Sequence, residues 1–164
     1  DALLLVKAEE VGIKVALIPL VYMILNSVAV FLSVPMGSLS DRIGREKLII
    51  FGFLLYSLVY FGFGTTQDQG MILLLFALYG VYSAATDGVQ KALVSDLVDK
   101  DRKGTALGLY NAILGITLLP ASLIAGVLYD NVSSMAAFYF GAIMAFIAAI
   151  MMFIFYKTKP RRAV

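Results

Sequence analysis

Residues Met135–Tyr156 read MAAFYFGAIMAFIAAIMMFIFY, a stretch without a single charged side chain. A helix needs about 20 consecutive, mostly apolar residues to cross the hydrocarbon core of a bilayer, and this stretch supplies them. It is far too long for a barrel strand and lacks the alternation of apolar and polar residues that such a strand shows. The sequence therefore predicts a membrane-spanning helix near its C-terminus.

Four further apolar stretches precede this one, at about 15–36, 48–65, 71–94 and 105–128. Of the 164 residues, 61% are apolar and only 15% are charged, whereas soluble domains average nearer half and a quarter. A soluble fold of this composition would lack the polar residues to cover its surface. We therefore predict an all-α membrane protein, with residues 1–14 as an extracellular connection and residues 15–164 as a partial transmembrane domain.

Basic residues occur in alternate joints between the spans. The joint 37–47 holds Arg42, Arg45 and Lys47, and the joint 95–104 holds Lys100, Arg102 and Lys103. The tail after the last span holds Lys157, Lys159, Arg161 and Arg162, whereas the joints 66–70 and 129–134 hold no basic residue. Cytoplasmic loops are enriched in Lys and Arg. This pattern predicts a multi-pass protein of the plasma membrane, by preference a bacterial inner membrane, with a cytoplasmic C-terminus and one more span before Asp1.

Several classes of function are excluded or disfavoured by what the sequence lacks. It contains neither Cys nor His, so zinc sites and catalytic triads with a His base are excluded. No phosphate-binding loop and no nucleophile elbow occurs, so we expect no enzyme, no metal and no cofactor. The net charge of +2 is too small to suggest nucleic-acid binding.

Small residues repeat at helical spacing in three of the spans. Because lipid supplies no hydrophobic force between helices, close packing there relies on such residues. We expect helix packing at all three faces, with a specific dimer motif as the alternative. The faces consist of Gly80, Ala84 and Gly88; of Gly104, Gly108 and Ala112; and of Ala137, Gly141, Ala145 and Ala149.

Polar side chains distinguish the spans from one another. The spans at 15–36, 71–94 and 105–128 carry polar residues in their interiors, whereas those at 48–65 and 135–156 carry almost none. An unpaired polar group in hydrocarbon costs roughly 2–7 kcal/mol. We therefore expect the polar faces to line a protein interior or a water-filled path, and the other two spans to face lipid. The candidate cavity, substrate-binding or proton-binding residues are Asn26, Ser83, Asp87, Gln90, Lys91 and Asn111.

Asp87 is the most informative of these residues. It precedes Asp96 by nine residues, which places it about 13 Å inside the span at 1.5 Å per residue. A carboxylate at the centre of a membrane helix costs about 2.5–3.5 kcal/mol on insertion scales. Two interpretations remain open: a structural pair with Lys91 at i+4, and a direct role in binding substrate or protons.

The joint between the first two spans carries the most specific pattern in the chain, Gly37-Ser-Leu-Ser-Asp41-Arg42-Ile-Gly44-Arg45. It resembles the signature loop of the major facilitator superfamily, in which Gly, Asp, a basic residue, Gly and Arg recur at these spacings. A second basic residue usually follows, but Glu46 stands in that place and Lys47 supplies the charge one position later. The stretch Lys100–Asn111 also looks like the loop and helix start of spans ten to eleven in many bacterial members.

The resemblance covers essentially the whole chain and implies an architecture. Members have twelve spans in two pseudo-symmetric halves of six, with a site between the halves. The five spans would be two to six or eight to twelve, and the similarity of Lys100–Asn111 favours the second half. By resemblance, Gly37, Asp41, Arg42, Gly44 and Arg45 would be gating residues. Asp41 would dock against a helix start in the missing N-terminal half of the same transporter.

The function predicted from these features is that of a transporter fragment. It would move a small-molecule substrate by alternating access within the lipid bilayer, driven by a gradient and coupled to protons through Asp87. The alternative is a membrane scaffold or receptor-like module of the same fold that does not transport, in which Asp87 would be dispensable.

Overall fold

The computed structural model describes residues 2–158, and every regular element in that range is helical. Two short 3₁₀ turns, Val15–Leu17 and Lys100–Arg102, lead into longer helices. The helices are α1 (Ala2–Glu10), α2 (Ile18–Ile43), α3 (Arg45–Thr65), α4 (Gln69–Asp96), α5 (Lys103–Asn131) and α6 (Ser134–Thr158). Five of them are long and apolar enough to cross a membrane. The chain is therefore an all-α, multi-pass membrane protein, as its composition predicts.

The helices extend beyond the apolar limits that define the spans in the sequence. The difference is largest at the first joint, where α2 runs on to Ile43 and α3 begins at Arg45. Polar residues continue a helix as well as apolar ones do, so hydropathy alone does not show where it ends. Helix α1 lies within residues 1–14, the range expected to be a connection. The basic residues Lys159, Arg161 and Arg162 lie outside the described residues.

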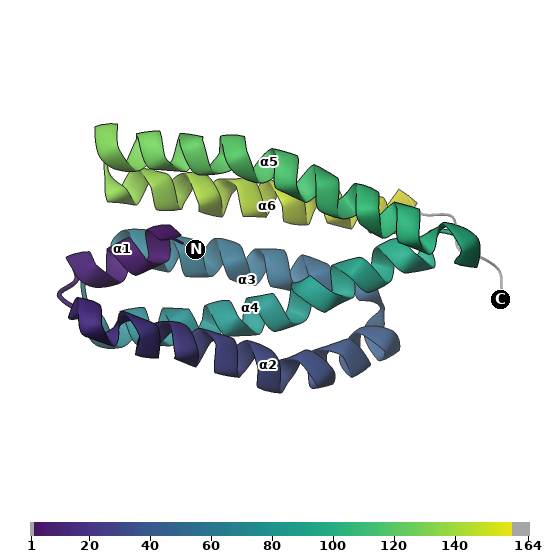
Figure 1. The fold of residues 1–164 in the computed structure, drawn as a ribbon, viewed down its shortest axis with the longest axis horizontal. Coiled ribbons are helices and arrows are strands. Elements are labelled where there is room, and N and C mark those ends of the chain that lie inside the picture. The colour runs from purple at the N-terminus through teal and green to yellow at the C-terminus, as the bar shows by residue number, and fades with distance from the viewer. Residues whose placement is uncertain (1, 159–164) are drawn as a thin grey trace.

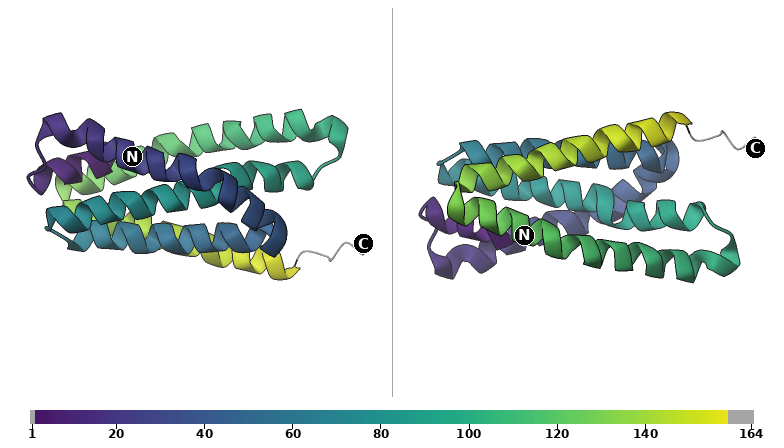
Figure 2. Two further views of the ribbon diagram at one scale, coloured as in Figure 1. Left: turned by 90° about the horizontal axis from the view of Figure 1, so that it is seen from below. Right: turned by 90° about the horizontal axis from the view of Figure 1, so that it is seen from above.

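The long helices form two groups (Figure 1). Helices α5 and α6 form one group, but they meet near the joint between them and diverge toward their other ends (Figure 2), and α2, α3 and α4 form the other group. Helix α3 packs against both α4 and α6 and so joins the two groups, and α2 packs mainly against α4. The views in Figure 2 place α1 at the end of the bundle where α5 meets α6, with its N-terminus directed between the groups.

Small residues bring several of these helices into close contact, as predicted for α4 and α6. A Cβ atom built at Gly80 would lie 2.5 Å from the backbone oxygen of Leu25, so α4 touches the backbone of α2 there. A Cβ atom at Gly141 would lie 2.6 Å from the ring of Tyr60, which places α6 against α3. The packing residues Ala137, Ala145 and Ala149 of α6 are buried.

Helix α5 departs from this pattern. None of its residues is buried, and a Cβ atom at Gly104 or Gly108 would meet nothing within 4 Å. The packing predicted for this glycine face is therefore not formed within residues 2–158. Small residues make close packing possible, but they do not identify the partner.

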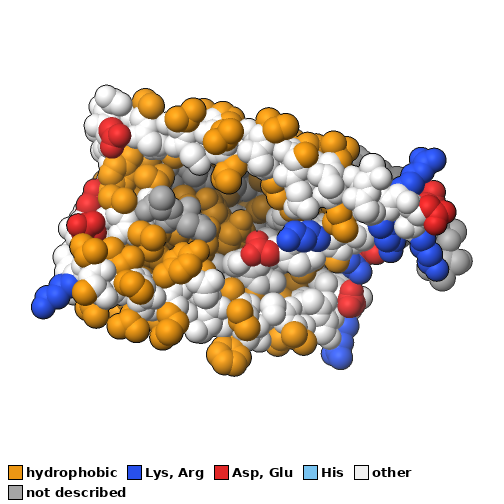
Figure 3. Space-filling model, in the orientation of Figure 1, with side chains coloured by type: hydrophobic (Ala, Val, Ile, Leu, Met, Phe, Trp, Pro, Cys, Tyr) orange, Lys and Arg blue, Asp and Glu red, His pale blue; other side chains and the backbone are white. Residues whose placement is uncertain are grey.

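Hydrophobic and charged side chains occupy different parts of the surface. Space-filling spheres in Figure 3 show Lys and Arg gathered near the end of the bundle where α4 meets α5. Helix α3 exposes an apolar stripe consisting of Phe51, Leu54, Leu58 and Phe61. The prediction that this span faces lipid fits this stripe alone, because α3 is otherwise more buried than α2 and α5 within residues 2–158.

Candidate functional site

A single glycine separates α2 from α3 at the signature-loop residues. Gly44 has φ of 101°, a conformation that side-chain-bearing residues rarely adopt. Its backbone N–H donates to the carbonyl oxygen of Ser40, which closes α2, and α3 starts at the next residue. The chain reverses direction between two long helices at this one residue. This explains why the motif has a glycine at position 44.

Arg45 connects three helices at this corner. Its Nε lies 2.8 Å from Oδ2 of Asp96 at the end of α4, and its Nη2 lies 3.4 Å from Oδ1 of Asp41 on α2. The Arg45 side chain is 24% exposed, against 48% for Asp96 and 67% for Asp41, so the shorter of the two contacts is also the better shielded. Arg42 is exposed and forms no ion pair within residues 2–158.

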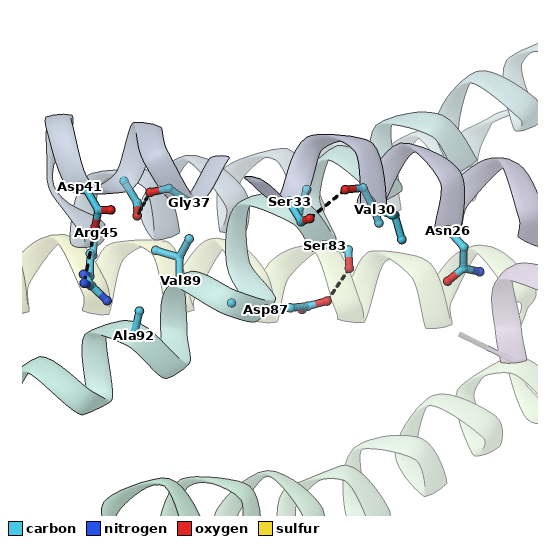
Figure 4. A pocket seen from close by; sticks show the side chains of 14 residues that line it. Asn26, Val30, Ser33, Gly37, Asp41, Arg45, Ser83, Asp87, Val89 and Ala92 are labelled. Atoms are coloured by element: carbon cyan, nitrogen blue, oxygen red, sulfur yellow. Dashed lines mark hydrogen bonds and ion pairs between the residues drawn. The ribbon is translucent and has the colours of Figure 1, made fainter. Parts of the chain in front are cut away.

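A crevice of about 440 Å³ runs between α2 and α4 from this corner (Figure 4). One wall consists of residues of α2 spaced by three or four, and the other consists of α4 residues at the same spacing. We call it the α2–α4 crevice. Its polar lining residues are Asn26, Ser33, Ser40, Asp41, Arg45, Ser83 and Asp87.

Asp87 lies in the lining of the crevice and accepts a hydrogen bond from the Ser83 hydroxyl (Figure 4). No ion pair joins it to Lys91, although both belong to the described part of the chain. The structure therefore does not form the structural pair that the i+4 spacing allows. Asp87 is exposed within this chain, which leaves its carboxylate open to water or a ligand.

The remaining candidate residues are not all brought together. Asn26 lines the crevice and donates from Nδ2 to the Tyr22 carbonyl oxygen at 2.8 Å. Gln90 does not line the crevice, and its Oε1 accepts from the Tyr110 hydroxyl of α5. Lys91 and Asn111 are exposed and line neither the crevice nor the larger cavity described next.

A larger cavity of about 850 Å³ is lined by residues of α3, α4, α5 and α6. Its wall on the α3–α4 side includes Tyr56, Tyr60 and Tyr82, and its opposite wall consists of apolar and small residues of α5 and α6. The rings of Tyr56 and Tyr60 stack with centroids 4.1 Å apart, and Tyr82 meets Tyr56 edge-on at 4.8 Å. The cavity lining is thus more strongly apolar than that of the crevice.

Comparison with known proteins agrees with this architecture. The family model for the Major Facilitator Superfamily matches residues 2–164. The chain belongs to the major facilitator superfamily. An uncharacterized MFS-type transporter of Methanocaldococcus jannaschii is 42% identical over 131 residues, which cover 80% of this chain and 33% of that protein.

Two further relatives of this superfamily chain carry more specific names. Multidrug resistance protein 3 of Bacillus subtilis is 23% identical over 131 residues, covering 79% of this chain and 26% of that protein. The puromycin resistance protein pur8 of Streptomyces alboniger is 29% identical over 113 residues, covering 68% of this chain and 22% of that protein. The chain thus spans about a third or less of the length of these relatives.

Sequence reasoning missed one residue of the signature-loop site in this superfamily member. Asp96 provides the shortest contact of Arg45, yet it is 51 positions away in sequence and marks only the end of a span. One weak signal could have suggested Asp96. It is a carboxylate near the end of a predicted span, beside a joint with basic residues.

A second polar cluster lies at the other end of the superfamily fold and was also not predicted. We call it the α1 cluster; it consists of Lys7, Glu10, Tyr129 and Ser134. The Tyr129 hydroxyl donates to Glu10, the Ser134 hydroxyl donates to Glu10 Oε2 at 3.1 Å, and Lys7 Nζ lies 3.5 Å from the same oxygen. The cluster ties α1 to the joint between α5 and α6.

The carboxyl group of Glu10 has a lowered pKa as a result. Partial burial acts to raise this pKa, but the hydrogen bonds from Tyr129 and Ser134, together with the positive charge of Lys7, lower it by more. Glu10 therefore stays ionised below the pH at which a free glutamate takes up a proton.

Proposed function

We propose that the chain is one half of a secondary transporter that moves a small solute by alternating access. Of the two halves, the second is the one that we favour. The observation that carries this proposal is the α2–α4 crevice, which has polar residues on both walls. Its lining includes Asp87, which belongs to a helix that is apolar enough to span the membrane. A carboxylate that is costly to insert and has no ion-pair partner within residues 2–158 fits a site for a ligand or a proton.

The signature loop fits a role in gating on the cytoplasmic side. Arg45 joins the ends of α2, α3 and α4 through Asp41 and Asp96, so these three ends form one corner. The contact of Asp41 with Arg45 is long, at 3.4 Å, and the Asp41 side chain is 67% exposed, which leaves it available to the missing half. The partners in this proposal are a small-molecule substrate, protons, the other half of the transporter and the lipid bilayer.

The names of the relatives suggest a first class of substrates to test. Two of them are named for multidrug and puromycin resistance, so export of antimicrobial organic molecules is the starting hypothesis. Because the chain spans only part of those proteins, the test uses the full-length transporter.

The experiment compares Asp87→Asn with Asp99→Asn in the full-length protein. Bacteria without their main exporters express each variant, and growth is measured on a panel that includes puromycin. We expect the unmodified protein and Asp99→Asn to raise resistance to at least one compound and Asp87→Asn to lose that resistance. Asp99 is the matched control because it is exposed and its side chain forms no cap hydrogen bond.

Vesicles then show whether a proton gradient drives the transport. Efflux of the compound identified on the panel is followed with and without an imposed pH gradient. If Asp87→Asn retains full gradient-driven transport, the proposed role of Asp87 is wrong. If the unmodified protein moves no compound at all, the alternative of a non-transporting scaffold of the same fold gains support.

A further inference from the structure

We propose that an exposed face shared by α3 and α6 binds an anionic phospholipid, and that Lys47 and Lys157 hold its headgroup. This inference does not depend on the proposed transport. We call this surface the α3–α6 face. It consists of the apolar stripe of α3 (Phe51, Leu54, Leu58 and Phe61) and of a second apolar row on α6 (Ile143, Phe146, Ile150 and Phe153).

The α3–α6 face is apolar and open along both helices. Its eight residues are between 43% and 63% exposed. They recur at intervals of three or four residues, which places each row on one side of its helix. None of the eight lines the cavity of about 850 Å³, so the face is separate from that cavity.

The two helices that carry the face are in contact at both of its ends. At one end, the ring of Phe61 stacks on that of Tyr139 with the centroids 5.2 Å apart. At the signature-loop end, Nζ of Lys47 lies 5.8 Å from the centre of the Tyr156 ring. The surface is therefore formed before a ligand arrives, which lowers the conformational cost of binding.

Two lysines mark the signature-loop end of the α3–α6 face. Lys47 lies one turn before Phe51 on α3, and Lys157 lies one turn after Phe153 on α6, with its Nζ 4.8 Å from the centre of the Phe153 ring. Both lysines are exposed and form no ion pair within residues 2–158, whereas the neighbouring acid Glu46 is buried. This end therefore presents two positive charges beside an apolar surface.

The length of the face suits the acyl chains of a lipid. The fourteen positions from Lys47 to Phe61 correspond to about 21 Å along α3 at 1.5 Å per residue. One leaflet contributes half of the hydrocarbon core of a bilayer, or about 15 Å. Acyl chains of the leaflet on the signature-loop side can therefore lie along the apolar rows while the headgroup is level with the lysines.

The charge of the lysines selects the headgroup. Each ammonium group has three N–H donors for phosphate oxygens, and an aromatic ring attracts the ammonium without neutralising it. A zwitterionic headgroup would bring a positive group of its own to Lys47 and Lys157. A headgroup with a net negative charge, such as phosphatidylglycerol, therefore fits this end of the face better.

A tryptophan reports the lipid at this site, because residues 1–164 contain no Trp. In the full-length transporter, with any other tryptophans replaced, Tyr156→Trp places the fluorophore beside both lysines. Vesicles of phosphatidylcholine contain the same mole fraction of either brominated phosphatidylglycerol or brominated phosphatidylcholine, and quenching gives the relative binding constant of the two lipids. We expect Tyr156→Trp to favour phosphatidylglycerol. Tyr139→Trp, at the end without lysines, is the matched control and should show no preference.

Charge variants in the Tyr156→Trp protein test the two lysines. A single Lys near anionic headgroups favours binding by about fivefold, so Lys47→Gln and Lys157→Gln should each lower the relative binding constant of phosphatidylglycerol by about this factor. Lys100→Gln is the matched control, because Lys100 is an exposed lysine in the joint between α4 and α5, outside the α3–α6 face. It should leave the preference unchanged.

Three outcomes would overturn the lipid site. Equal binding of the two lipids at Tyr156→Trp would show that negative charge is not selected. A loss of preference in Lys100→Gln as large as that in Lys47→Gln would show that the overall charge of this end attracts the lipid. Absence of quenching by both lipids would show that protein, such as a second copy of the chain, covers the face.

Thermal unfolding provides a second measurement that needs no reporter. A ligand that binds only the folded protein raises its unfolding temperature. Phosphatidylglycerol added to phosphatidylcholine micelles should raise this temperature for the unmodified protein and for Lys100→Gln, and raise it less for Lys47→Gln. An equal rise in all three would contradict the site. Neither measurement requires transport, so the lipid site and the proposed function are tested separately.

Discussion

Arg45 shows how much of the signature-loop site depends on one side chain. Its contact with Asp96 is short but lies at the surface, where ion pairs contribute little to stability. A double-mutant cycle of Arg45→Ala and Asp96→Ala should therefore give a coupling free energy of about 0.5–1 kcal/mol. The measurement is equilibrium unfolding of the full-length protein in mixed micelles.

Arg42 provides the matched control for that cycle. It is exposed and forms no ion pair in the described part of the chain, so Arg42→Ala should change the free energy of unfolding by less than about 0.5 kcal/mol. A coupling near zero between Arg45 and Asp96 would show that the three helix ends are not held together by this pair.

Glu10 leads to a prediction about pH. Its pKa in the folded protein is lower than that of a free glutamate, so its interactions stabilise the fold above the pH at which a free glutamate is protonated. Their contribution is lost as the pH falls through the lowered pKa of the folded state. Glu10→Gln should therefore destabilise the protein near neutral pH and show a weaker loss of stability in acid.

Glu9, which lies on α1 but outside the α1 cluster, supplies the control for this measurement. Thermal unfolding of the full-length protein is followed as the pH is lowered, for Glu10→Gln and for the exposed Glu9→Gln. Equal acid sensitivity of the two variants would show that Glu10 does not account for the effect.

At the scale of the helices, Gly80 and Gly115 make opposite predictions for the same substitution. Gly80→Ala would place a Cβ atom 2.5 Å from the Leu25 backbone and force α2 away from α4, at a cost of about 1–3 kcal/mol. Gly115→Ala meets nothing within 4 Å and should be neutral or stabilising by up to about 1 kcal/mol through helix propensity. Thermal unfolding of both variants tests this, and equal effects would contradict the packing of α2 on α4.

The elements also show what sequence reasoning can and cannot provide. The polar content of the spans singled out Asn26, Ser83 and Asp87, and the structure brings all three into one crevice. The sequence could not show that Gln90 instead accepts a hydrogen bond from Tyr110. Gln90 and Asp87 differ in direction around the helix by only a fraction of a turn, so their partners cannot be told apart from spacing. Asp96 and the α1 cluster were missed because their partners lie on other helices, up to 124 positions away in sequence.

For the whole molecule, the alternation of basic joints predicts the orientation in the membrane. Asp99, in the joint between α4 and α5, should lie in the cytoplasm, and Ser133, between α5 and α6, should lie outside. Cysteine placed at Asp99 should react with an impermeant reagent in inside-out vesicles, and cysteine placed at Ser133 should react in intact cells. Reaction of both from the same side would contradict the five-span arrangement.

Helix α5 has a consequence for how the protein is made in the cell. With no buried residue, it is retained in the bilayer chiefly by its own hydropathy and only weakly by its neighbours. Newly inserted helices in this state resemble unassembled subunits, which membrane proteases remove. Expressed alone, residues 1–164 should therefore be degraded faster than the same residues within the full-length transporter, as a pulse-chase experiment would show.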